Sequence, residues 1–495
     1  MQFTTLVFLF FFLPICLFFV FISRPNFRNT LLFLASLVFY AWAGVWYVCV
    51  LAGSILINYL SGILIGNARP GMKKSWFVLG LILNILGLVI FKYTGFLVSN
   101  FNLLIPVFRM NPVAVAHIVF PLGISFFTFR GICYLITVKR GESPAERNII
   151  RLGLYLGFFA TVIAGPIDRY RDFSPQLTQR ILTPGLFASG VLRFCLGLTK
   201  KVIISTPIAL TADRIFATDP AVLSAPLAWL GALSFMLQIY FDFSGYTDMA
   251  IGIGRMLGFR ITENFNFPYM ARSIRDFWKR WHITLSTWLR DYLFLPIAYA
   301  ASRRLKKEKY LGIRVDFLLY GVAALVTFFL CGLWHGAAWT FIAWGMLYGL
   351  LLVLERSRFG KWLDKGPALL ARFYTLFFVL ISWVIFRSPD LGFAGHYLTV
   401  MFGLGGAKTD WAIFIPYANR EFLIMAFLGV LGCTPVWSKL LELANGLMKN
   451  RHRIPASVTF HGVQVLTILG VLLVLAYTTL TLVTGSIQSF IYYKF

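Results

Sequence analysis

Long apolar runs are the feature of this sequence that most restricts its fold. A helix of roughly 20 apolar residues crosses a bilayer, and the chain contains about a dozen such runs. Hydrophobic residues make up 59% of the 495 residues, and charged residues only 13%. A soluble domain cannot bury so much apolar surface, because a large shell of any globular protein faces water. We therefore expect an all-α, polytopic transmembrane protein whose surplus apolar surface is covered by lipid.

The apolar runs predict about 11–14 membrane helices, some of them re-entrant. No internal repeat or low-complexity linker divides the chain, so we expect one membrane domain over residues 1–495. The more polar residues 113–355 are expected to form a catalytic core, flanked by scaffold helices in 1–110 and 360–495. The expected spans are 3–22, 31–48, 50–66, 76–97, 113–138, 152–166, 186–209, 226–254, 277–298, 316–333, 337–354, 368–386, 421–438 and 460–484.

The net charge of +26 would suggest a nucleic-acid partner in a soluble protein. Here the positive side chains gather in loops between apolar runs, as at Arg69, Lys73 and Lys74. Cytoplasmic loops of membrane proteins carry such an excess of Lys and Arg, so we expect no nucleic-acid binding. Arg24 and Arg28 follow the first span, whereas nothing positive except the amino group precedes it. The N-terminus is therefore predicted to lie outside the inner membrane.

Residues 158–175 would make a poor lipid-facing span. They turn at Gly165-Pro166 and then become polar. Proline lacks the helix hydrogen-bond donor and disfavours helix in the residue before it. Because broken backbone at membrane depth is tolerated only where protein or a water-filled cavity covers it, we expect a re-entrant or half-membrane element here.

The stretch 240–292 is too polar for lipid contact and too aromatic for an ordinary loop. A helix that starts near Ser273 would place His282 on one face with two tryptophans and two leucines. Asp276 and Arg280 would form an i, i+4 pair on another face. Taken alone, a histidine on an apolar stripe is more often a hydrogen-bonded core residue than a catalyst.

A second histidine, His335, interrupts an apolar stretch from about residue 317 to 354. Ionisable groups inside a span are costly and suggest a functional site. Gly332 and Gly336 would let another backbone or a substrate approach His335 closely. Imidazole can act while neutral and can exchange a proton near physiological pH. The alternative is a structural histidine that bonds a neighbouring helix. The chain has no HExxH motif and no Cys/His cluster, so no metal site is expected. It also has no GxSxG motif, so a serine hydrolase has no support.

At these residues the chain resembles the membrane-bound O-acyltransferase family, and in particular its bacterial branch that O-acetylates polysaccharides. The ordered set of motifs, with two Trp-His pairs, is highly specific, and the likeness covers nearly the whole chain. The matching stretches are 121–127, 164–166, 240–252, 263–266, 277–292, 332–337 and 383–387.

The resemblance implies that His335 is the catalytic histidine and that His282 is the second histidine of this branch. It also implies acetyl as the acyl group. The implied partners are an SGNH-type acetyltransferase, periplasmic or membrane-anchored, and the machinery that makes and exports the polysaccharide. Acyl transfer from a thioester needs a base for the attacking hydroxyl and donors for the oxyanion. We expect His335 to be the base. His282 could orient the acceptor, donate to the oxyanion or hold the thioester.

A central tunnel is expected, because acetyl-CoA is cytoplasmic whereas a secreted polysaccharide lies outside. Acetyl-CoA is expected as a substrate, with no bound cofactor. A basic stretch after the His282 segment has two interpretations, a cytoplasmic anchor or a dock for CoA phosphates or for an acidic phosphopantetheine carrier. Its residues are Arg303, Arg304, Lys306, Lys307 and Lys309.

Three other functions stay open at this point. In the first, the protein is still an acyltransferase, but its donor is a D-alanyl carrier protein and its acceptor is teichoic acid. Polar, broken helices are also typical of a transporter, although no obvious inverted repeat supports one. A purely structural subunit of a membrane complex is the third possibility.

Overall fold

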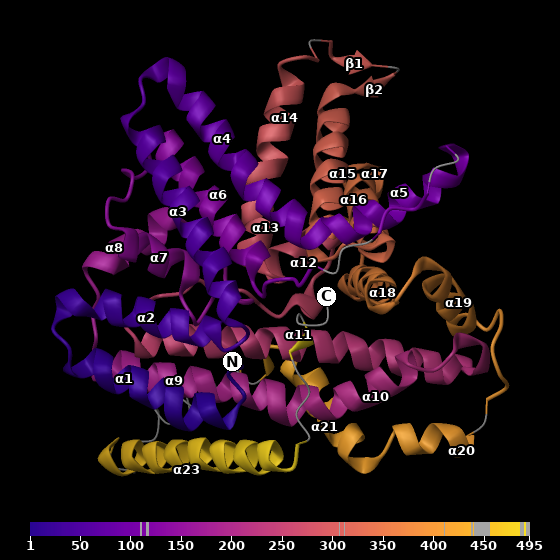
Figure 1. The fold of residues 1–495 in the computed structure, drawn as a ribbon. Helices are drawn as coiled ribbons and strands as arrows, with labels where there is room; N and C mark the ends of the chain where they lie inside the picture. The colour runs from indigo at the N-terminus through magenta and orange to yellow at the C-terminus, as the bar shows by residue number, and fades with distance from the viewer. Residues whose placement is uncertain are drawn as a thin grey trace. The chain divides into compact units, whose positions relative to one another are not determined.

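A computed structural model describes residues 1–108, 111–114, 118–305, 307–310, 312–409, 411–436, 439, 456–485 and 490–491. The chain divides into two compact units. Unit 1 comprises Met1–Phe194 and Tyr246–Thr262, and unit 2 comprises Cys195–Gly245 and Glu263–Phe495. Helices dominate both units, as Figure 1 shows, so the all-α prediction is confirmed. The division into units does not test the catalytic core expected at 113–355, which stays a prediction.

Unit 1 is built from α-helices and their short π-helical and 3-10 extensions. They are η1 (Phe8–Phe12), α1 (Leu13–Ile22), η2 (Pro25–Phe27), α2 (Arg28–Ala41), α3 (Val45–Asn67), α4 (Pro70–Leu88), η3 (Val89–Tyr93), α5 (Thr94–Phe108), α6 (Ile124–Arg140), α7 (Ile149–Gly157), α8 (Tyr170–Thr178) and most of α9 (Pro184–Leu198). The end of α11 (Ala225–Met256) also belongs to it.

Helix α6 forms the centre of unit 1 and packs against both α3 and α4. Two asparagines join α3 to α4 in this apolar setting. The Nδ2 of Asn58 donates to the Oδ1 of Asn84 at 3.0 Å, and the Nδ2 of Asn84 donates back at 3.1 Å. Gly131 of α6 faces the Asn58 amide, where a Cβ would collide with it. Such small and polar residues are what lets membrane helices associate, since lipid is as apolar as their side chains.

The connection between α7 and α8 contains no regular helix, although every residue from 158 to 168 is buried. The predicted break in the helix is therefore confirmed, but it begins after Gly157, earlier than the Gly165-Pro166 turn. The expected span over 152–166 is accordingly wrong in its second half. The residues of this connection are apolar enough to resemble a span, because they are covered by protein and not by water.

Arg130 on α6 supplies the hydrogen bonds that this irregular backbone lacks. Its side chain is buried, and its guanidinium donates to the carbonyl oxygens of Tyr155 at 3.2 Å, Thr161 at 3.4 Å and Pro166 at 2.8 Å. A guanidinium presents several donors in a fixed plane, which suits three carbonyls around one point. The arginine thus replaces the helical bonds that the broken segment does not make.

The described residues of unit 2 form further helices and one short hairpin. They are η4 (Thr199–Ser205), α10 (Thr206–Phe216), η5 (Pro220–Val222), the first part of α11, η6 (Pro268–Met270), α12 (Ile274–Arg280), α13 (Ile283–Leu289), η7 (Arg290–Phe294), α14 (Leu295–Ser302), β1 (Lys309–Tyr310), β2 (Ile313–Arg314), α15 (Val315–His335), α16 (Trp339–Arg356), α17 (Arg358–Lys365), α18 (Ala368–Arg387), α19 (Leu391–Met401), α20 (Trp411–Phe414), η8 (Ile415–Tyr417), α21 (Arg420–Gly432) and α23 (Ala456–Val483). Strands β1 and β2 pair antiparallel.

Helices α15 and α16 pack closely because glycines line their contact. A Cβ on Gly332 would meet the carbonyl oxygen of Phe341, and a Cβ on Gly345 would meet that of Phe328. This confirms for Gly332 that a small residue near His335 admits another backbone at close range, whereas a Cβ on Gly336 would meet the ring of Phe341. The approaching backbone belongs to α16 of the same unit, so the glycines here serve helix packing.

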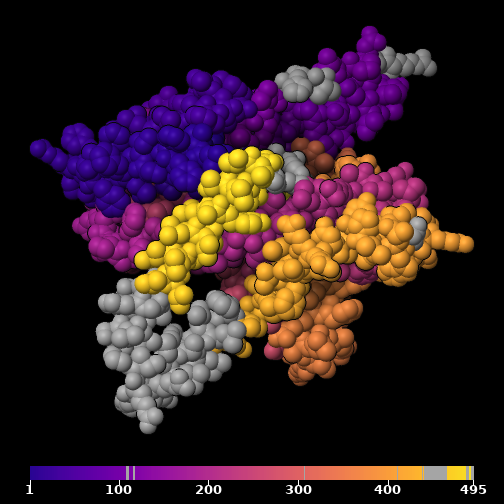
Figure 2. All heavy atoms as spheres, turned by 90° about the horizontal axis from the view of Figure 1, so that it is seen from below, coloured from indigo at the N-terminus to yellow at the C-terminus, as the bar shows by residue number. Residues whose placement is uncertain are grey.

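Seven helices among the described residues are long and apolar enough to cross a bilayer, and the chain is a multi-pass membrane protein. They are Val45–Asn67, Pro70–Val107, Ala225–Met256, Val315–His335, Trp339–Arg356, Ala368–Arg387 and Val465–Val483. A pair of helices bent by 62°, Trp411–Ala418 and Arg420–Gly432, would make an eighth span. Exposed leucines cover α23, the yellow helix in Figure 2, where Leu466 and Leu473 are each 70% exposed. Such a surface is suited to lipid.

We predict that Arg130→Met destabilises the protein strongly. The buried carbonyl oxygens of Tyr155 and Pro166 would lose the Arg130 donor, whereas that of Thr161 keeps the Gly165 N–H. Each orphaned acceptor costs about 1–3 kcal/mol. Thermal unfolding of the purified protein in detergent measures the loss. Arg140→Met, at an exposed position on the same helix, is the control and should leave the unfolding temperature nearly unchanged. Equal stability of the two variants would contradict the role assigned to Arg130.

Candidate active site

The helix expected to run on from Ser273 is interrupted at His282, so that part of the prediction was wrong. Ser273 does begin α12, because its Oγ accepts a hydrogen bond from the Asp276 N–H at 3.0 Å. The predicted pair is also confirmed, with 2.8 Å between the Nε of Arg280 and the Oδ1 of Asp276. His282 then has φ 44° and ψ 55°, and α13 begins at Ile283. This left-handed backbone is uncommon and costly for a residue other than glycine.

A neighbouring stretch of chain holds the backbone on both sides of this break. The N–H of Asn266 donates to the carbonyl of Arg280 at 3.0 Å, and the N–H of Ile283 donates to the carbonyl of Asn264 at 2.9 Å. Backbone groups on both sides of the break, which would form helical hydrogen bonds in a continuous helix, are therefore bonded to the stretch 264–266. The consequence is that this left-handed backbone, and not the register of a continuous helix, sets the position of the His282 side chain.

The Asn264 amide orients the His282 ring. Its Oδ1 lies 3.1 Å from the Nδ1 of His282, and it also accepts from the N–H and Oγ1 of Thr284 at 3.1 and 2.9 Å. A backbone N–H can only donate, so the atom at this point is the amide oxygen and not the nitrogen. The Nδ1 of neutral His282 must then carry the hydrogen. This leaves the Nε2 with a lone pair that can accept a proton or a hydrogen bond.

The Nε2 of His282 is buried and makes no hydrogen bond to any residue that the structure describes. Aromatic rings surround the imidazole. The ring centroid of Phe243 lies 4.8 Å away in a T-shaped arrangement, and that of Trp334 lies 6.3 Å away. A buried polar atom without a partner is costly, so native proteins rarely retain one without a reason. The arrangement is suited to a substrate group that donates a hydrogen bond to Nε2.

His335 ends α15 and lies in the same aromatic cluster. Its ring centroid is 4.8 Å from Trp334, 4.8 Å from Trp344 of α16 and 5.4 Å from Phe386 of α18. The side chain is nearly buried, since the residue is 8% exposed. Trp334 adjoins both imidazole rings, so the structure brings the two predicted histidines into one site. Their catalytic roles stay predictions.

The sequence analysis assigned no role to three residues that contact the two histidines. Asn264, Phe243 and Phe386 all lie in stretches quoted for the family resemblance, but no periodicity or spacing marked them as neighbours of the histidines. A polar residue in an aromatic stretch, as in Glu263–Asn266, was the available signal. Among the described residues, no group of three or more His, Cys, Asp or Glu is placed to hold a metal ion.

The basic stretch lies apart from the histidines. Arg303 and Arg304 follow α14, Lys307 lies before β1 and Lys309 in it, and all four are exposed. They belong to the α14–α15 connection, which carries the β1–β2 hairpin (Figure 1). Lys306 lies outside the described residues. This connection precedes α15, whereas His335 is its last residue, and a 21-residue helix is about 30 Å long. These cations therefore cannot contact a thioester at His335, and a role toward the distant phosphates of a donor stays a prediction.

Comparison with known proteins agrees with this geometry. A profile of the membrane-bound O-acyltransferase family matches residues 136–387, which include both histidines. The chain is 41% identical to a probable alginate O-acetylase of Azotobacter vinelandii, over 83% of this chain and 79% of the relative. It is 38% identical to a peptidoglycan O-acetyltransferase of Helicobacter pylori, over 82% of this chain and 81% of the relative. It is 31% identical to a teichoic acid D-alanyltransferase of Bacillus subtilis, over 54% of this chain and 68% of the relative.

We predict that His282 is the Nδ1–H tautomer and that Asn264 selects it. Nitrogen-15 NMR of histidine-labelled protein, with the His282 signals identified by their absence in His282→Gln, distinguishes the protonated from the unprotonated ring nitrogen. Asn264→Leu should abolish the preference, because the acceptor for the Nδ1 hydrogen is gone. Asn266→Leu, at an exposed position of the same stretch, is the control. A protonated Nε2 in the unmodified protein would contradict the assignment.

Proposed function

The chain belongs to the membrane-bound O-acyltransferase family, and on that premise we propose that it moves acetyl from cytoplasmic acetyl-CoA to a hydroxyl of an exported polysaccharide. It is a multi-pass membrane acyltransferase. The observation that carries the proposal is the pair of buried imidazoles beside Trp334 within the matched region. Acetyl is favoured over D-alanyl because the two O-acetyl-transferring relatives match about four fifths of the chain, whereas the D-alanyl relative matches 54%.

The proposed reaction joins the acceptor oxygen to the acetyl carbon and breaks the carbon–sulfur bond of the thioester. His335 removes the proton of the hydroxyl as it attacks, and returns that proton to the departing CoA thiolate. Neutral imidazole suits this task at membrane depth, because no charge has to be held there before the reaction begins. The products are an O-acetyl ester and CoA thiol, so no further reactant is needed.

His282 is assigned to hold the donor. In the tautomer supported by Asn264 and Thr284, its Nε2 carries no hydrogen and cannot donate to an oxyanion. An accepting nitrogen does fit an amide N–H, and the pantetheine arm of CoA carries such groups. This argues against donation to the oxyanion. An accepting nitrogen fits both remaining roles, orienting the acceptor hydroxyl and holding the thioester arm, and we propose the second. The aromatic rings around both histidines would keep water away from the thioester.

The setting of the reaction follows from the same proposal. We place the protein in the inner membrane with its N-terminus outside, as the positive loops indicate, and we expect a tunnel between the two faces. Acetyl passes to the polysaccharide directly or through a serine of a partner acetyltransferase. The exposed cations Arg303, Arg304 and Lys307 would face the cytoplasm and bind the phosphates of the donor.

We predict that His335→Ala loses about 10²–10⁴-fold in kcat for acetyl transfer, as expected for removal of a general base. His282→Ala should instead raise the KM for acetyl-CoA about threefold to tenfold, the effect of one hydrogen bond, with a smaller change in kcat. Radiolabelled acetyl-CoA and purified protein in proteoliposomes provide the assay. His396→Ala, at an exposed histidine of α19, is the control.

Three outcomes would overturn parts of this proposal. Full activity of a folded His335→Ala protein would reject its role as the base. A kcat loss in His282→Ala as large as that in His335→Ala, with unchanged KM, would assign proton transfer to His282. Transfer from a D-alanyl carrier protein, and none from acetyl-CoA, would move the protein to the teichoic-acid activity of its more distant relative.

A further inference from the structure

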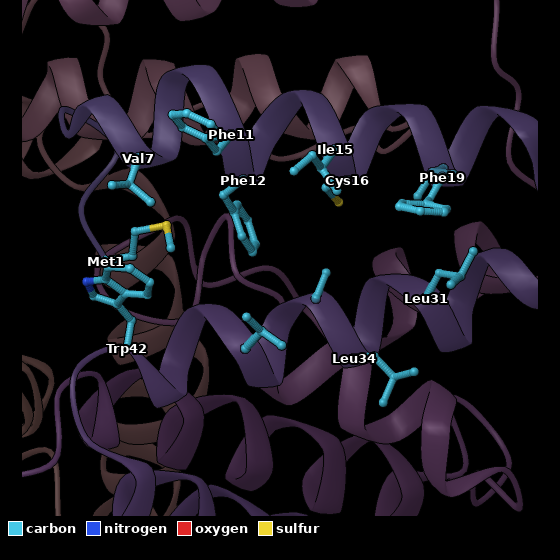
Figure 3. A pocket seen from close by; sticks show the side chains of 13 residues that line it. Met1, Val7, Phe11, Phe12, Ile15, Cys16, Phe19, Leu31, Leu34 and Trp42 are labelled. Atoms are coloured by element: carbon cyan, nitrogen blue, oxygen red, sulfur yellow. The ribbon is translucent and has the colours of Figure 1, made fainter.

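An apolar groove runs along the surface of unit 1 between α1 with η1 and α2. Figure 3 shows side chains from both helices lining it, from Met1 and Trp42 at one end to Phe19 and Leu31 at the other. Several of the lining side chains are widely exposed, with Phe11 at 62%. Between Leu31 and Trp42, the residue that follows α2, the helical rise is about 17 Å. This length is close to that of one acyl chain, since one leaflet provides half of the roughly 30 Å hydrocarbon core.

Positive charge gathers beyond the Leu31 end of the groove. Arg28 is the first residue of α2 and lies one helical turn before Leu31, on the same side of the helix. Arg180 reaches the same place from another part of the chain, since its Nη2 donates to the Oδ1 of Asn29 at 2.7 Å. Burial and the nearby charge of Arg28 lower the pKa of Arg180 to about 10. Two guanidinium groups thus lie close enough to repel each other.

No anion within the described residues balances these two charges. The Nε of Arg28 and the Nη1 of Arg180 are buried atoms that bond no described residue, and no described carboxylate forms an ion pair with either side chain. The guanidinium carbon of Arg180 also lies 4.6 Å from the centroid of the Phe259 ring, a cation–π contact that leaves the positive charge without a counter-ion. Both side chains are partly exposed, so a ligand can reach them, and two adjacent guanidinium groups without a described protein anion are suited to an anionic ligand with several acceptor oxygens.

We propose that this groove and the two arginines form a binding site for one anionic glycerophospholipid. One acyl chain lies along the groove between α1 and α2, and the phosphate accepts hydrogen bonds from Arg28 and Arg180. The apolar groove and the cationic end are continuous along α2, which is the arrangement of tail and headgroup in a lipid. The site belongs to unit 1 and does not depend on the proposed acyl transfer.

Lipid retention tests this site without an activity measurement. The full-length protein is reconstituted in phosphatidylcholine nanodiscs that contain equal small fractions of phosphatidylglycerol and phosphatidylethanolamine. After repurification in detergent, mass spectrometry counts each bound lipid. The unmodified protein should retain phosphatidylglycerol preferentially. Arg28→Gln/Arg180→Gln should retain about tenfold less of it, as expected for the loss of two cations near a phosphate. Arg69→Gln, at an exposed arginine of the α3–α4 loop, should behave like the unmodified protein.

A second variant separates the groove from the charges. Ala35→Trp fills the groove and leaves both arginines in place, so it should also lose phosphatidylglycerol. If the double arginine variant does not fold, the Ala35→Trp variant alone tests whether phosphatidylglycerol binds in the groove. Equal retention of phosphatidylglycerol and phosphatidylethanolamine by the unmodified protein would overturn the proposal. Retention unchanged by Ala35→Trp would do the same, and dimer formation through the groove in place of lipid binding would assign it to a second copy of the chain.

Discussion

The structure depends on one requirement, that backbone polar groups shielded from water find hydrogen-bond partners within the protein. Inside a bilayer, every N–H and C=O that leaves a helix must find a partner within the protein. In unit 1, Arg130 supplies donors to the carbonyls of the irregular connection between α7 and α8. In unit 2, the stretch 264–266 supplies backbone bonds on both sides of the break at His282. At these two departures from helix, backbone groups are bonded by partners from another part of the same unit.

The break at His282 links this constraint to function. A continuous helix would have fixed the imidazole by its register on the helix, whereas the left-handed backbone places the ring against the Asn264 amide. The amide selects one tautomer and leaves the Nε2 as an acceptor within an aromatic cluster that also contains His335. Backbone strain of about 1–3 kcal/mol persists only where the surroundings determine it, and such strain is often found at functional sites. The strained backbone and the unbonded nitrogen occur at the same residue.

Much of this arrangement could be predicted from the sequence because membrane insertion leaves a strong compositional signal. Apolar runs gave the all-α class, and the cost of an imidazole inside a span pointed to His335. The break at His282 could not be predicted, because a residue of ordinary helix propensity is driven there by hydrogen bonds to residues 264–266, which precede it in the chain. Arg130 was missed because it lies within an apolar run, where its carbonyl partners come from a distant connection. The local sequence pattern identified a residue whose type is rare in a membrane span, such as His335. It did not identify residues whose role comes from contacts with distant parts of the chain.

Donor and acceptor are proposed to meet at the two imidazoles beside Trp334. The most direct measurement is a structure of the protein in nanodiscs with a non-hydrolysable acetyl-CoA analogue in which a methylene replaces the thioester sulfur. We predict that the ketone carbon lies within about 4 Å of the His335 ring, and that an amide N–H of the pantetheine arm donates to the Nε2 of His282. An analogue bound elsewhere, with both imidazoles still enclosed by their aromatic neighbours, would contradict the account.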